Sequence, residues 1–118
     1  MRIDNPSVVT IIEHIHRDLA DNNYENLVKE GYLTEEGVIG IKSLINSQKN
    51  SITVPPLQKL SIAKDIWFTK PRSTNEARYY LIEQYLWLNN EESDFIIQFL
   101  CSETIDNKIT VQIGGLVT

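Results

Sequence analysis

Few side chains in this sequence have the types and spacing that metal binding requires. Glu91, Glu92 and Asp94 could offer oxygen ligands to a divalent cation, but the Asp-x-Asp-x-Asp-Gly loop and the distant bidentate Glu of a calcium site are missing. A solvated turn is the simpler interpretation. His14 and His16 are two residues apart in an expected helix, so they do not share a face at metal-ligand spacing. We expect no metal site and no cofactor.

Nucleophilic catalysis is not indicated either. The serines stand in no nucleophile-elbow motif, and both histidines lie early in the chain, far from the later serines. The single cysteine, Cys101, stands in an apolar run, as is typical of a buried and unreactive thiol. We therefore expect a protein that is not an enzyme.

Length and composition predict a single domain spanning residues 1–118. A chain of 118 residues that is 42% hydrophobic is long enough for one domain with its own core and too short for two. The mean hydropathy is -0.23, and no apolar run approaches the roughly 18 residues that a membrane helix needs. No secretory signal is visible at the N-terminus. We expect a cytoplasmic protein without a membrane partner.

Charge is distributed in blocks along the chain. The net charge is -5, which argues against nucleic acid as the ligand because phosphate binding needs clustered Lys and Arg. Residues 1–37 carry 3 basic and 8 acidic side chains, residues 38–78 carry 7 and 2, and residues 79–118 carry 1 and 6. Acidic surfaces of this kind can steer a basic protein partner, although solvated faces would give the same pattern.

Helices are expected in the N-terminal part of the chain. The first begins at Asn5 and Pro6, which suit the cap and the first turn. A second, of about two turns, runs from Tyr24 towards Gly31, and a third follows Thr34. The first helix has one apolar stripe, formed by Val8, Ile11, Ile12, Ile15 and Leu19.

Residues 46–75, in the middle of the chain, are expected to form loops and short extended pieces. Residues 46–50 form a polar linker, and residues 52–54 form a short extended piece that ends at Pro55. Residues 57–69 are expected to form a turn followed by a strand, and residues 70–75 a basic loop.

Residues 79–101 form the central feature of the sequence, a predicted hairpin. Two runs rich in aromatic and β-branched residues flank six polar ones at positions 89–94. Alternation places Phe95, Ile97, Phe99 and Cys101 on one face, which should meet the helices. The first strand is apolar on both sides, which indicates either double cover or an exposed binding patch. The predicted fold is α+β, with about three N-terminal helices packed on one face of an antiparallel sheet of three to four strands.

Several segments resemble a family of small bacterial domains of unknown function. They are residues 18–27 and 33–36, Leu86 and Trp87 followed by the acidic turn before Phe95, and residues 111–117. In size, acidity and lack of catalytic residues the chain is also similar to immunity proteins, which neutralise the toxins of bacterial contact-dependent growth inhibition systems. That resemblance implies a toxin domain as the partner.

Three functional hypotheses remain open. The first is an immunity-type protein, monomer or homodimer, that binds a cationic toxin such as a nuclease. The second is a cone-shaped α+β domain with an internal small-molecule pocket walled by Tyr80, Trp67 and Trp87. The third is a structural homodimer that buries the outer sheet face. The partner-binding residues of the first hypothesis are Tyr79, Glu83, Tyr85, Trp87, Glu91, Glu92, Asp94, Glu103 and Asp106.

Overall fold

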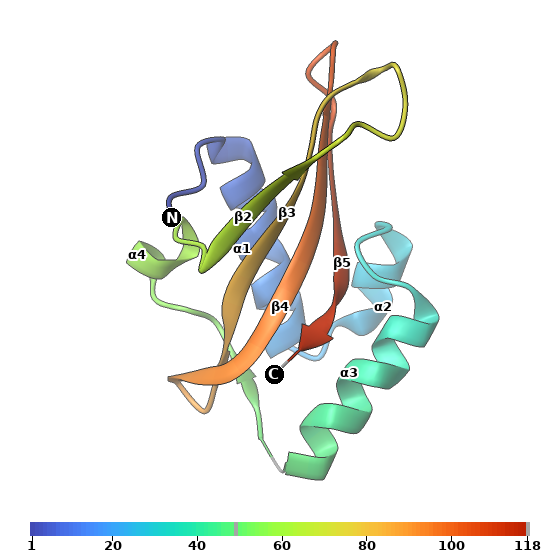
Figure 1. The fold of residues 1–118 in the computed structure, drawn as a ribbon. Helices are drawn as coiled ribbons and strands as arrows, with labels where there is room; N and C mark the ends of the chain where they lie inside the picture. The colour runs from blue at the N-terminus through green and yellow to red at the C-terminus, as the bar shows by residue number, and fades with distance from the viewer. Residues whose placement is uncertain (49, 118) are drawn as a thin grey trace.

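A computed structural model describes residues 1–48 and 50–117, which form four helices and five strands (Figure 1). The helices are α1 (Pro6–Ala20), α2 (Tyr24–Lys29), α3 (Glu35–Gln48) and α4 (Leu57–Leu60). The strands are β1 (Ile52–Thr53), β2 (Asp65–Thr69), β3 (Glu76–Leu88), β4 (Glu91–Thr104) and β5 (Ile109–Val117). The predicted α+β class is confirmed.

The first helix begins where the sequence indicates. Asn5 is its N-cap, and the side chain of Asn5 accepts a hydrogen bond from Ser7 N at 3.0 Å, which satisfies one of the exposed amides of the first turn. Val8, Ile12 and Leu19 are buried along the predicted stripe. The start of α3 is similar, because Thr34 Oγ1 accepts from Gly37 N at 3.0 Å.

The sheet is antiparallel, and the long β3–β4 hairpin is its centre. β4 pairs with β3 and β5, whereas the other edge of β3 pairs with both β2 and β1 at different points along its length. A two-residue turn joins β3 to β4, with Asn89 and Asn90 at φ values of 53° and 65°. Asparagine tolerates this left-handed region, which two-residue hairpin turns require.

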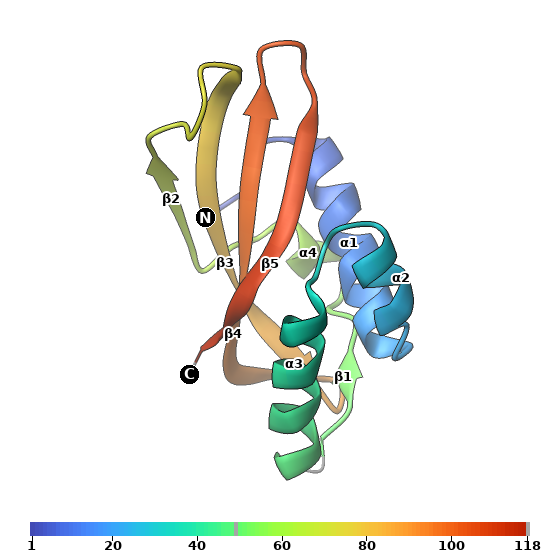
Figure 2. The ribbon, with the colours of Figure 1, turned by 90° about the vertical axis from the view of Figure 1, so that its right-hand side faces the viewer.

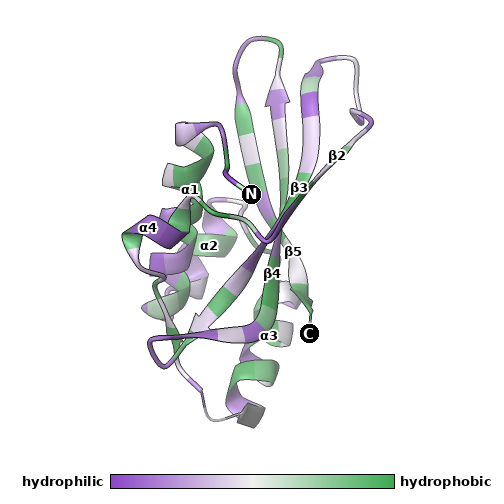
Figure 3. Ribbon diagram, turned by 60° about the vertical axis from the view of Figure 1, so that its left-hand side comes forward, coloured by the Kyte–Doolittle hydropathy of each residue, from purple (hydrophilic) through white to green (hydrophobic). Residues whose placement is uncertain are grey.

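The helices lie on one side of the sheet, as the view in Figure 2 shows. Strand residues that face them are buried, including Ile82 and Leu86 of β3 and Ile97 and Phe99 of β4. Hydrophobic and hydrophilic residues alternate along the strands in Figure 3, as expected for a sheet with two different faces. We call the side away from the helices the outer face, and define its residues below.

Some element boundaries differ from the sequence-based expectation. Residues 57–60 form a short helix instead of a turn, and α3 continues to Gln48, so the linker expected over residues 46–50 was placed too early. Lys49 of that linker lies outside the described residues. Residues 91–94 belong to β4 and not to the hairpin tip, because the turn needs only two residues. None of the described helices has the length and apolar character to cross a membrane.

Candidate protein-binding face

The outer face presents the alternate side chains of β3 that point away from the helices. Cross-strand partners share a face in an antiparallel sheet, so the register extends this surface into β2 and β4. Most of its side chains are half-buried, whereas Trp67 of β2 is 56% exposed. The outer face includes Asp65, Trp67, Tyr79, Leu81, Glu83, Tyr85, Trp87, Glu92, Ile96, Gln98 and Leu100.

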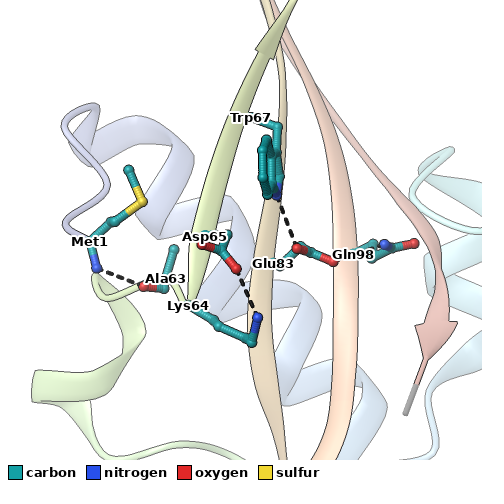
Figure 4. Close-up of polar contacts among 7 residues, drawn as sticks. All are labelled: Met1, Ala63, Lys64, Asp65, Trp67, Glu83 and Gln98. Carbon is teal, nitrogen blue, oxygen red and sulfur yellow. Dashed lines mark hydrogen bonds and ion pairs between the residues drawn. The ribbon is translucent and has the colours of Figure 1, made fainter.

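Glu83 lies at the centre of the outer face, held by residues of both neighbouring strands. Trp67 Nε1 donates to one carboxylate oxygen at 3.1 Å, and Gln98 Nε2 donates to the other at 3.0 Å. Figure 4 shows Trp67 and Glu83 meeting across β2 and β3. Both donors are neutral, and Glu83 forms no direct ion pair with a described residue, although Lys64, which pairs with Asp65, also interacts with Glu83 through space. The carboxylate is therefore fixed in position, and its charge remains available to a cation from outside.

Basic and acidic groups lie at opposite ends of the outer face. At the end near residues 70–75, the Arg72 guanidinium stacks over the Tyr79 ring, 4.4 Å from its centroid. At the hairpin end, Glu92 is opposite Trp87 and is exposed. Lys64 lies beside the face and pairs with Asp65 at 2.8 Å, as Figure 4 also shows. The surface is thus aromatic with charges of both signs, and not uniformly acidic.

Five of the nine sequence-predicted partner residues come together on this face: Tyr79, Glu83, Tyr85, Trp87 and Glu92. The remaining four lie elsewhere. Glu91 is opposite Leu88, which faces the helices, and Asp94 is an exposed residue in the irregular part of β4. Asp106 lies in the β4–β5 turn, at the other end of the sheet, and Glu103 is on the helix side.

Glu103 belongs to a polar cluster on the helix-facing side of the sheet. It accepts a hydrogen bond from the Tyr80 hydroxyl at 2.7 Å and lies 3.6 Å from Arg78 Nη1. Burial and this hydrogen bond raise the pKa of Tyr80 far above its usual value, and burial raises the pKa of Cys101 to about 12. Neither group is therefore primed as a nucleophile or a base near neutral pH.

A second buried polar pair, His16 and Gln84, was not recognised from the sequence. His16 is fully buried, and its Nε2 lies 3.1 Å from Gln84 Oε1. The sequence did contain a sign that His16 is buried. His16 follows Ile12 by four residues and precedes Leu19 by three, which places it on the apolar stripe of α1. Trp67 and Gln98 were likewise missing from the predicted partner residues. The pairing of β2 with β3, which brings in Trp67, is not visible in the sequence, whereas the β3–β4 hairpin that places Gln98 opposite Glu83 was predicted.

The three residues proposed to wall an internal pocket do not lie together. Tyr80 is buried on the helix side, whereas Trp67 and Trp87 point to the outer face, so the three side chains do not surround one cavity. The described residues also include no group of three or more His, Cys, Asp or Glu side chains placed to hold a metal ion.

Comparisons with protein-family models, with curated proteins and with solved structures gave no match for this chain. The family resemblance therefore stays a prediction, and the function has to be argued from the geometry.

Proposed function

We propose that this protein is a non-catalytic, immunity-type binding protein that holds a basic protein domain, such as a toxin, against its outer face. One observation carries the proposal: Glu83 is fixed by two neutral donors at the centre of an aromatic surface and forms no direct ion pair with a described residue, since the nearby Lys64 pairs with Asp65. A half-buried carboxylate among aromatic rings suits an Arg or Lys side chain of a partner. Aromatic anchors around a central charged contact are typical of tight interfaces.

The overall charge of the protein supports the same class of partner. A net charge of -5 and the exposed carboxylate of Glu92 would accelerate the approach of a cationic domain. The cations at the Arg72 end limit this attraction to part of the face, so we expect the partner to carry its basic groups over Glu83 and the hairpin end.

The product of the gene beside its own is the first partner to test. We expect the two proteins to form a stable complex on co-expression, and we expect this protein to rescue the growth of cells that the neighbouring product alone impairs. A neighbouring product that neither harms cells nor binds would count against the immunity function.

Replacing Trp87 with alanine should weaken that complex about tenfold, which corresponds to about 1.4 kcal/mol. The indole provides a large apolar contact area on the same face of β3 as the central carboxylate, and alanine removes it. Isothermal titration calorimetry measures the change. Leu57→Ala is the matched control, because Leu57 is 77% exposed but lies in α4, off the outer face. Equal losses for both variants would contradict the assignment of the face.

Replacing Glu83 with glutamine should slow complex formation and reduce its dependence on salt. Glutamine keeps the shape of the side chain but removes the charge that a cation of the partner would meet. We expect a loss of affinity of about fivefold to tenfold at low ionic strength, measured by surface plasmon resonance at several salt concentrations. The exposed Glu36→Gln variant, on α3, should behave as the unmodified protein. A salt-independent affinity for the partner would refute the electrostatic part of the proposal.

Self-association through the same face is the second candidate function. Arg72 lies at one end of the outer face and Glu92 at the other. If a two-fold axis packed two copies face to face with their strands antiparallel, Arg72 of each copy would meet Glu92 of the other. Size-exclusion chromatography distinguishes the candidates. A dimer that Trp87→Asp dissociates would favour a homodimer and remove the main support for toxin binding by this face.

A further inference from the structure

We draw no further inference here: the strongest candidate, the outer edge of β2, which pairs with no described strand and lies beside the exposed side chains of Trp67 and Phe68, carries nothing because nothing in the structure shows what covers it.

Discussion

Replacing Gln84 with leucine should lower the free energy of unfolding by about 3 kcal/mol. The Gln84 amide nitrogen donates to Leu60 O at 2.9 Å and to Ile62 O at 3.0 Å, while its oxygen lies 3.1 Å from His16 Nε2. Leucine is of similar size, so little packing is lost. All three partners would lose a hydrogen bond, and each buried polar group left without one costs about 1–3 kcal/mol. The three groups can move partly towards water, so we expect the total of these costs to lie at the lower end of its range.

Urea denaturation followed by circular dichroism measures this loss. Gln98→Leu is the matched control, because Gln98 is half-buried on the outer face and, among the described residues, its side chain makes one hydrogen bond, to Glu83. We expect the control to lose less than about 1 kcal/mol. If both variants lose the same amount, the His16–Gln84 pair does not link α1 to the α4 segment as described.

The same pair decides which nitrogen of His16 carries the proton. Both hydrogens of the Gln84 amide are directed at main-chain carbonyls, so its oxygen faces His16 and Nε2 must be the donor. Nδ1 is buried and has no hydrogen-bond partner in the described structure. A second proton on Nδ1 would therefore be a buried charge without an acceptor.

Stability should consequently fall as the pH is lowered from about 6.5 to about 4. Burial lowers the pKa of His16 to about 4 from its ordinary value of 6.5, and the Gln84 hydrogen bond offsets this only in part. Within this window the unfolded chain binds a proton at His16 and the folded chain does not, so protonation favours unfolding. The full loss is about 3 kcal/mol, since each unit of pKa difference corresponds to about 1.4 kcal/mol. Below pH 4 both states bind the proton and His16 contributes no further change.

The variant His16→Gln isolates this contribution. Glutamine cannot titrate, so only the unmodified protein should lose this contribution to its unfolding free energy as the pH falls from 6.5 to 4. A series of urea titrations of both proteins measures this change relative to the variant. Carboxylates titrate in the same range in both proteins and cancel in the difference. A constant difference across this window would show that His16 is not held neutral by burial.

The sequence determined the strongest local features of the fold. Asn5 and Pro6 marked the start of α1, and the alternation of apolar residues over residues 79–101 predicted the central hairpin and its helix-facing side. Both signals are local, since a cap needs one side chain and a strand needs a period of two. The same alternation places Glu103 with Phe99 and Cys101, so its position on the helix side was readable from the sequence and was missed.

Tertiary structure alone decided which residues form the candidate sites. β2 is five residues long and could have paired with any free edge, but it joins β3 beside β1, which brings Trp67 to Glu83. Gln84 joins His16 across 68 positions of sequence. Such contacts depend on how elements pack after chain segments far apart are brought together, and local propensity carries no information about that choice. The sequence by itself determined the chemistry of each side chain, and the tertiary structure determined which side chains are neighbours.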